Sequence, residues 1–144
     1  MSVTGDDYCF VCGPLNELGL HLKFETEENG VSRTVWTPDK MHQGYVNLTH
    51  GGLIATVLDE CMVRMLWHLD VPAVTARFEL ELKLPAPVGE PLYCEGRVVR
   101  DRGKVLECTA EARNEAGDIV ALAKSKSVVQ GKRNPQRLGE GIEK

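Results

Sequence analysis

The sequence lacks an apolar run of the roughly 18 residues that a membrane-spanning helix needs. It also lacks an excess of basic residues, because 17 lysines and arginines against 21 aspartates and glutamates give a formal net charge of −4. No strong positive field therefore favours nucleic acid or an anionic membrane surface. We expect neither nucleic acid nor a membrane as a partner, although local basic residues remain available for a phosphorylated ligand.

An export signal is missing as well. The first seven residues, Met1 to Asp7, are acidic and have no apolar core. The five cysteines are an odd number, which does not suit a disulfide framework and favours a reducing cytoplasm. No internal repeat is present, and 144 residues fit one domain with a substantial core.

One long helix is predicted from about Gly51 to His68. Its apolar positions recur at i, i+1, i+4 and i+5 over four turns, which makes a broad buried stripe; they are Leu53, Ile54, Val57, Leu58, Cys61, Met62, Met65 and Leu66. Glu60 and Arg64 form an i, i+4 pair on the helix surface. Asp59 has no such partner and is the uncommitted acid of the two.

Strands are predicted on both sides of this helix. The segments alternate in polarity or are rich in β-branched residues; they are residues 20–25, 31–37, 74–84, 92–100, 105–114 and 119–130. Short turns separate the last four, which predicts an antiparallel meander. The predicted fold class is α+β, with a curled antiparallel sheet wrapped around one central helix and a sheet edge free for dimerisation.

Three regions follow from this pattern. Residues 1–18 form an N-terminal leader with a Cys-x-x-Cys pair, and residues 19–130 form the folded domain. Residues 131–144 are charged and poor in apolar side chains, so we expect a polar, disordered tail.

The start of the predicted helix carries the chemistry. Gly51 and Gly52 open it, and a helix N-terminus offers unpaired N–H groups and a partial positive charge. Without a Cβ, glycine lets a polarised carbonyl approach these amides closely. Asp59, two turns further on, is the nearest candidate base or nucleophile. The pattern indicates acyl chemistry.

The stretch His50-Gly51-Gly52-Leu53-Ile54-Ala55-Thr56-Val57-Leu58-Asp59-Glu60 resembles the signature of hotdog-fold thioesterases of the phenylacetate-pathway (PaaI-like) type. The order of elements and the turn Leu84-Pro85-Ala86-Pro87-Val88-Gly89-Glu90 are similar too. This resemblance implies a hotdog fold, a dimer or dimer of dimers, and hydrolysis of acyl-coenzyme A at the subunit interface. It also implies Asp59 as the catalytic carboxylate, Gly51 as the oxyanion-hole amide and Thr75 as the hydroxyl that orients water or the carboxylate.

The sequence departs from this family pattern in one place. Members usually carry Asn or Gln six residues before the histidine, where this chain has Gly44. Either Gln43 takes that role through a one-residue shift, or this part of the oxyanion site is built differently; Asn47 lies closer to the histidine. His50 is either a base or, as we favour, a helix-entry residue that fixes the loop.

Further residues are assigned to substrate binding. Gly52 is expected beside Gly51 at the carbonyl. Basic residues are candidates for the phosphates of coenzyme A, because guanidinium groups pair well with phosphate oxygens. The candidates are Arg97, Arg100, Arg102, Lys104, Lys124 and Lys126, among which the sequence alone does not choose; those assigned are Arg100, Arg102 and Lys104.

Cys9 and Cys12 form the other notable motif. A Cys-x-x-Cys pair can bind zinc or act as a redox couple. Zinc needs two further ligands, no second pair exists, and His21 is the only nearby nitrogen ligand. Gly13-Pro14 excludes the helix that a thioredoxin-like motif requires. The leader resembles the Cys-x-x-Cys-Gly leader of related thioesterases, and this resemblance implies a turn or packing role, so we expect no metal site.

The function predicted from the sequence is hydrolysis of acyl-coenzyme A thioesters in the cytoplasm by a homo-oligomer. No cofactor is expected, because coenzyme A enters as part of the substrate. The alternatives are a non-catalytic acyl-CoA-binding hotdog domain, a hotdog dehydratase or hydratase, and a zinc or redox protein built on Cys9 and Cys12.

Overall fold

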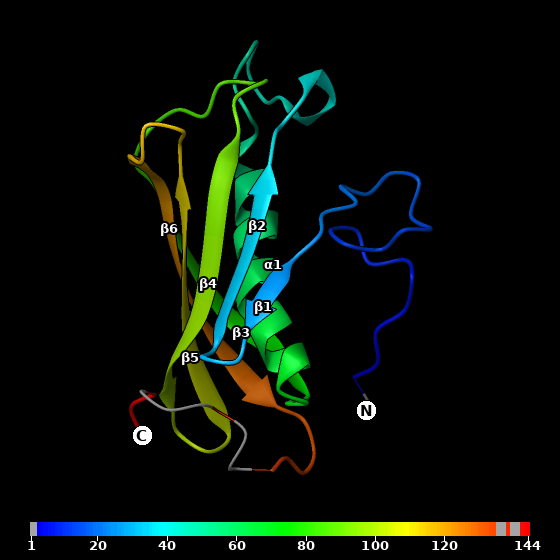
Figure 1. Ribbon diagram of the computed structural model, residues 1–144, viewed down its shortest axis with the longest axis vertical. Helices are drawn as coiled ribbons and strands as arrows, with labels where there is room; N and C mark the ends of the chain where they lie inside the picture. Colours follow the sequence, from blue (N-terminus) through cyan, green and yellow to red (C-terminus); the bar gives the residue numbers. More distant parts are fainter. Residues whose placement is uncertain (1–2, 135–137, 139–141) are drawn as a thin grey trace.

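The fold is one antiparallel sheet that wraps around one long helix (Figure 1). We describe it from a computed structural model, which covers residues 3–134, 138 and 142–144. The six strands lie in the order β1-β2-β4-β5-β6-β3. Their bounds are Glu25–Glu27 (β1), Val31–Trp36 (β2), Ala73–Leu82 (β3), Leu92–Asp101 (β4), Val105–Arg113 (β5) and Ile119–Val129 (β6). The helix α1 spans Gly51–His68, and a short 3₁₀ helix, η1, spans Lys40–His42.

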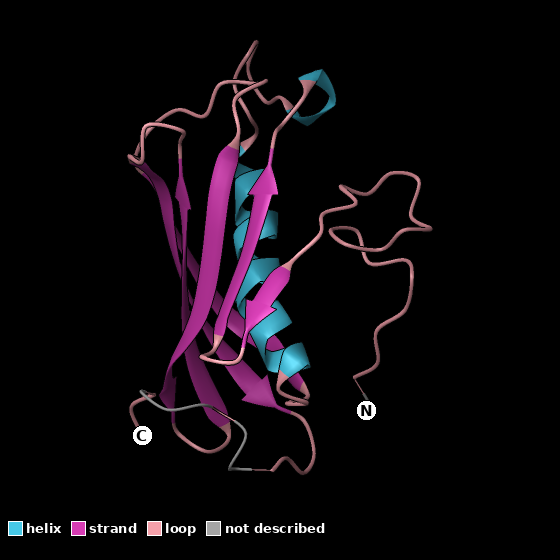
Figure 2. Cartoon of the chain, viewed as in Figure 1, coloured by secondary structure: helices cyan, strands magenta, loops and turns pink. Residues whose placement is uncertain are grey.

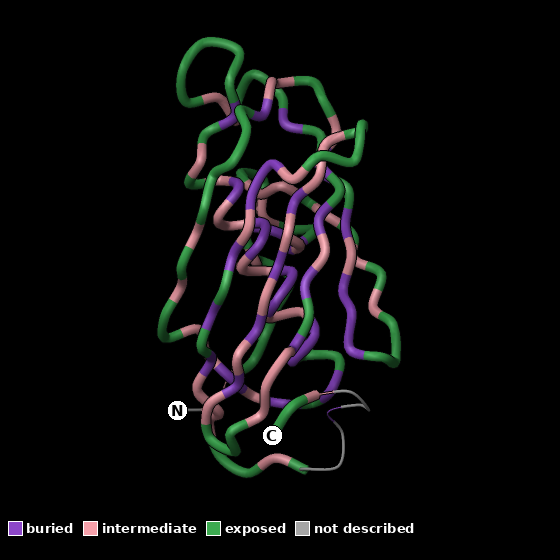
Figure 3. Tube along the Cα trace, turned by 90° about the vertical axis from the view of Figure 1, so that its left-hand side faces the viewer, coloured by how far each residue is buried: buried purple, intermediate pink, exposed green. Residues whose placement is uncertain are grey.

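The core lies between α1 and the concave face of the sheet (Figure 2). The predicted apolar stripe of the helix is confirmed, since Val57, Leu58, Cys61, Met62 and Met65 are fully buried. The residues of β5 alternate between buried and half-buried, as the pattern of period two requires (Figure 3). Small buried side chains on β5 and β6 leave room for the large side chains of the helix; they are Cys108, Ala110, Ala112, Ala121 and Ala123.

Gly96 marks the closest approach of the helix to the sheet. It lies in β4, against which α1 packs most extensively. A Cβ at this position would lie 2.6 Å from both the carbonyl carbon and the carbonyl oxygen of Cys61. Only glycine therefore lets the helix backbone rest directly on the central part of the sheet.

Two predictions about the strands are wrong. Residues 20–25 do not form a strand, because the N–H groups of Leu20 and Leu22 donate to the carbonyls of Phe10 and Val11, both at 2.8 Å. His21 between them has a left-handed backbone, with φ of 51°. The segment thus pairs with the leader, and β1 begins only at Glu25.

The last four strands do not form one meander either. β4, β5 and β6 do, but β3 pairs with β6 at the far edge of the sheet. The connection from β3 to β4 covers residues 83–91, longer than a hairpin loop, and it crosses one end of the sheet. This crossover closes the sheet around the helix and leaves β3 as an edge strand.

The predicted tail falls partly on residues outside the described ranges, namely 135–137 and 139–141. Within the described part, Leu138 is buried. The N–H of Asp101 donates to the carbonyl of Glu143 at 2.7 Å, so the chain end lies along β4. The domain boundaries and the disorder of the tail stay predictions. No described helix is long and apolar enough to cross a membrane.

Candidate active site

The first turn of α1 presents one free backbone donor. The Nδ1 atom of His50 accepts the N–H of Gly52 at 2.9 Å, and the His50 carbonyl accepts the N–H of Leu53 at 3.0 Å. The Gly51 N–H has no hydrogen-bond partner within the described part of the chain. This is the amide that the sequence assigns to the oxyanion hole. His50 acts as the N-cap of the helix, the structural role that we favoured.

An apolar groove surrounds this amide. It is open to solvent and has a volume of about 700 Å³. Tyr45, Leu82 and Leu84 line it and are exposed. Exposed apolar side chains around a backbone donor suit a ligand with a carbonyl and an apolar chain, or a partner subunit that covers them.

Asp59 and Thr75 meet between the helix and the sheet. The Thr75 hydroxyl donates to Oδ1 of Asp59 at 2.8 Å. Burial raises the pKa of the Asp59 carboxyl, and the hydrogen bond from Thr75 opposes this shift. The pairing of β3 with β6 shifts register between Thr75 and Arg77, a bulge of the kind that re-aims side chains. The structure thus brings together the acid and the hydroxyl that the sequence singles out.

Gly51 and Asp59 are far apart within one chain. Eight residues separate them along α1, and a rise of 1.5 Å per residue gives about 12 Å. Gly51 lies beside Leu82 at one end of β3, whereas Asp59 contacts Thr75 near the other end. One chain therefore does not hold the amide and the carboxylate against the same atom.

Gln43 and Asn47 shape the loop before the helix. The Oε1 atom of Gln43 accepts the N–H of Asn47 at 3.3 Å, and Asn47 has a left-handed backbone with φ of 63°. Neither residue lines the groove around Gly51, whereas Gly44 does. The contact between Gln43 and Asn47 fixes the loop, and the roles of these two residues at the thioester carbonyl stay predictions.

The basic residues assigned to coenzyme A lie around the β4–β5 turn. In Figure 1 this turn is at the opposite end of the sheet from the start of α1. Arg100 binds Glu143 at 2.8 Å, and Arg102 lies 3.3 Å from Glu107. Both arginines are thus paired with carboxylates in the single chain.

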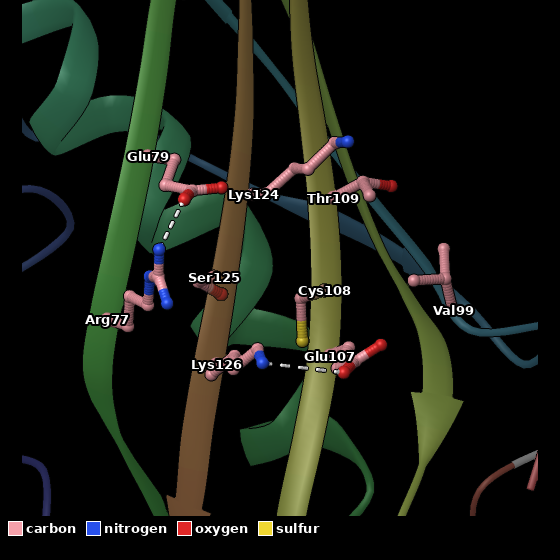
Figure 4. A pocket seen from close by; sticks show the side chains of 9 residues that line it. All are labelled: Arg77, Glu79, Val99, Glu107, Cys108, Thr109, Lys124, Ser125 and Lys126. Carbon is pink, nitrogen blue, oxygen red and sulfur yellow. Dashed lines mark hydrogen bonds and ion pairs between the residues drawn. The ribbon is translucent and has the colours of Figure 1, made fainter.

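A second groove lies on the outer face of the sheet, where it includes two of the basic candidates from the sequence, Lys124 and Lys126. Figure 4 shows the charged side chains that line it, arranged around the buried residues Cys108 and Ser125. They come from β3, β5 and β6, and they are Arg77, Glu79, Glu107, Lys124 and Lys126. Its volume is about 370 Å³. In the sequence, the only sign of this groove was the alternation that puts Lys124 and Lys126 on one face of β6. The pairing of β3 with β6 then places Arg77 and Glu79 beside these two lysines.

Residues 47–121, more than half of the chain, match the thioesterase superfamily. No curated protein sequence matched the chain. Among solved structures, a thioesterase superfamily protein shares 24% identity and a TM-score of 0.80 over 85% of this chain. The chain spans 60% of the length of that protein.

Two further similar structures come from bacteria. A hypothetical thioesterase of Streptococcus pneumoniae with coenzyme A has 18% identity and a TM-score of 0.73 and covers 78% of this chain and 88% of its own. The PaaI protein of Escherichia coli, from the phenylacetic acid degradation operon, has 18% identity and a TM-score of 0.71 and covers 76% and 83%. The S. pneumoniae protein was also solved with alanine in place of one aspartate or one threonine, 16 positions apart.

These likenesses agree with the antiparallel sheet around one central helix, which is the arrangement of the hotdog fold. The matched region runs from the loop before α1 to the first residues of β6 and includes every residue assigned to the reaction except Gln43. The chain therefore belongs to the thioesterase superfamily and has the hotdog fold.

Proposed function

We propose that this protein is a homodimeric acyl-coenzyme A thioesterase whose active sites are completed across the β3 edge. The observation that carries the proposal is the pair of half-sites along one strand. An unpartnered amide lies at the Leu82 end of β3, and a half-buried carboxylate held by a hydroxyl lies at the Thr75 end.

A two-fold axis beside the outer edge of β3, level with the middle of the strand, would supply what one chain lacks. The outer edge of β3 has no strand partner among the described residues, because β3 pairs only with β6. Antiparallel pairing with a second β3 would set the Leu82 end of one chain beside the Thr75 end of its partner. Gly51 of one protomer and the partner's Asp59 would then face a shared cleft.

The chemistry follows from this arrangement. The Gly51 N–H binds the thioester carbonyl oxygen and stabilises the negative charge that develops there. The Asp59 carboxylate either attacks the carbonyl carbon directly or takes a proton from water that attacks it. When water attacks, the carbon–sulfur bond of the tetrahedral intermediate breaks, and the leaving thiolate takes up the proton that Asp59 removed from water. When Asp59 attacks, the same bond breaks to leave a mixed anhydride on Asp59, which water then hydrolyses to regenerate the carboxylate. Both routes release a free acid and coenzyme A. The reaction needs no bound cofactor, because coenzyme A is part of the substrate.

Substrate binding uses the apolar groove and the basic turn. Leu48, Ile54 and Leu84 line the groove beside Gly51 and would contact the acyl chain or the pantetheine arm. The same two-fold axis would place the partner's β4–β5 turn at the Gly51 end. In each chain β5 and β4 lie two and three strand spacings from β3, so this turn would be about 10–15 Å from the β3 edge. The phosphates would then be reached by the partner's Arg100, the partner's Arg102 and the partner's Lys104. The two arginines would leave their carboxylate partners and bind phosphate oxygens instead. Coenzyme A in the S. pneumoniae structure supports this class of ligand.

The spacing of the acid and the hydroxyl gives further support. Asp59 and Thr75 are 16 positions apart, the same separation as between the aspartate and the threonine that were replaced in the S. pneumoniae protein. A half-buried carboxylate that is oriented by a hydroxyl suits general-base or nucleophilic catalysis better than ligand binding alone.

The test is release of free thiol from a panel of short, long and aromatic acyl-CoAs. Wild-type protein should hydrolyse at least one of them, and Asp59→Asn should lower kcat at least 100-fold, since a general base or nucleophile contributes about 10²–10⁴. Glu115→Gln, in the exposed β5–β6 turn, is the matched control and should keep full activity. Tight binding of every acyl-CoA without hydrolysis would instead favour the non-catalytic alternative, and undiminished turnover by Asp59→Asn would remove Asp59 from the mechanism.

A further inference from the structure

The Cys-x-x-Cys pair of the leader forms a tight turn. The N–H of Gly13 donates to the carbonyl of Cys9 at 2.8 Å. A Cβ at Gly13 would lie 2.5 Å from the Asp7 carbonyl oxygen and from the Cys9 nitrogen, so the turn closes only over glycine. This turn holds both cysteine side chains toward one side of α1.

Glu60 of α1 completes a three-ligand cluster with this turn. Its Oε1 atom lies 3.4 Å from Sγ of Cys12, and its Oε2 atom lies 3.9 Å from Sγ of Cys9. One ligand atom from each of the three residues lies within 4.8 Å of the others. The predicted ion pair of Glu60 with Arg64 is present at 3.9 Å, but Glu60 is not a surface residue, because only 16% of its side chain is exposed.

These separations approach those of a tetrahedral zinc site. Zinc bonds of about 2.3 Å to sulfur and about 2.0–2.2 Å to a carboxylate place neighbouring sulfur and oxygen ligands roughly 3.5 Å apart, and two sulfurs roughly 3.8 Å apart. Small side-chain rotations would bring all three ligands to a shared metal. Thiolate ligands select zinc over magnesium or calcium, which prefer oxygen alone.

The charges also balance around a divalent cation. The guanidinium of Arg64 lies 3.3 Å from Sγ of Cys12 and 3.9 Å from Oε1 of Glu60. Two thiolates and one carboxylate carry three negative charges, and a divalent metal with Arg64 carries three positive ones.

We propose that Cys9, Cys12 and Glu60 bind one Zn²⁺ ion that fastens the leader to α1. An open groove of about 470 Å³ adjoins the three residues, and Asp6 and Trp67 line its other walls. Water from this groove completes the tetrahedron. The site goes beyond the proposed thioesterase activity and does not depend on it, because its ligands are separate from Asp59, Thr75 and Gly51.

The test measures metal on full-length protein that is purified in reductant, stripped with chelator, reloaded with Zn²⁺ and desalted. Elemental analysis should find one zinc per chain, and the thermal midpoint should rise on loading. Most of the zinc, and the rise of the thermal midpoint on loading, should be lost in each of three variants, Cys9→Ser, Cys12→Ser and Glu60→Gln. Cys108→Ser is the matched control, because it removes a buried cysteine outside the cluster and should retain one zinc per chain.

Two further measurements keep the proposal falsifiable if a variant folds poorly. Wild-type protein loaded with Co²⁺ should show thiolate-to-cobalt charge transfer and the visible bands of a tetrahedral ion. Arg64→Met should bind zinc more weakly, because it removes the third positive charge that balances the two thiolates and the carboxylate. Wild-type protein with less than a tenth of an equivalent of zinc, or a cobalt spectrum without charge transfer, would overturn the site. Equal loss of zinc in Cys108→Ser and Cys12→Ser would do the same.

Discussion

Subunit exchange between two inactive variants tests whether the Gly51 amide and the Asp59 carboxylate act from different chains. Gly51→Pro removes the free N–H, and proline is well tolerated at the first position of a helix. His50 before it has φ of −62° and ψ of 124°, the extended backbone that a residue before proline requires. Asp59→Asn removes the charge but keeps an oxygen that accepts the Thr75 hydroxyl.

The expected activities follow from the arrangement of the half-sites. Loss of one oxyanion donor lowers kcat about 10²–10³-fold, and loss of the carboxylate about 10²–10⁴-fold, so each variant alone keeps about 1% or less. Random exchange at equal concentrations makes half of the dimers mixed. Each mixed dimer has one intact site and one doubly substituted site, so the mixture should recover about a quarter of wild-type activity.

The assay is thiol release before and after exchange of the two variants, which carry different affinity tags. Dimers that retain both tags after sequential purification should show about half of wild-type activity, because one of their two sites is intact. Each variant exchanged with itself is the control for the handling. Purified mixed dimers that stay near 1% would refute the shared site and would place amide and carboxylate in separate functions.

Two other predictions address the carboxylate and the core. Thr75→Val should move the acid limb of the kcat/KM pH profile to higher pH. The hydrogen bond from Thr75 lowers the Asp59 pKa, so its loss raises that pKa, and the reaction needs the ionised carboxylate. Thr75→Ser should restore the profile, and an unmoved acid limb in Thr75→Val would show that Thr75 does not act on Asp59. Gly96→Ala should destabilise the fold by about 1–3 kcal/mol in thermal unfolding, because its Cβ meets the α1 backbone at Cys61. The neighbouring exposed Arg97→Ala should change stability little, and equal midpoints for both variants would contradict the close approach of α1 to β4.

The sequence predicted what depends on local pattern. The bounds of α1 are confirmed at Gly51 and His68, because glycines open the helix and an apolar stripe of period 3.6 runs through it. Five of the six predicted strands are confirmed to within two residues, since turn residues interrupt the alternation between them. The match to the thioesterase superfamily also confirms the family that the helix motif implies.

The sequence did not predict contacts between distant segments. Leu20 and Leu22 alternate as a strand does, but their hydrogen bonds go to the leader. No local signal says that β3 pairs with β6 rather than β4, because strand partners depend on how the sheet closes around the helix. Glu60 is 51 positions from Cys9 and 48 from Cys12, so no local pattern connects the three residues. From the sequence, only the two cysteines were candidate zinc ligands, which is too few for a zinc site.

Asp59 and Glu60 show how one helix serves two separate sites. Successive residues of an α-helix point about 100° apart around its axis. Asp59 therefore meets Thr75 on β3, while Glu60 meets the cysteines of the leader. The two carboxylates lie in different surroundings, one facing a strand edge that a second subunit can cover and the other facing a groove of its own chain. The exchange experiment and the metal analysis thus measure independent properties, and failure of either leaves the other standing.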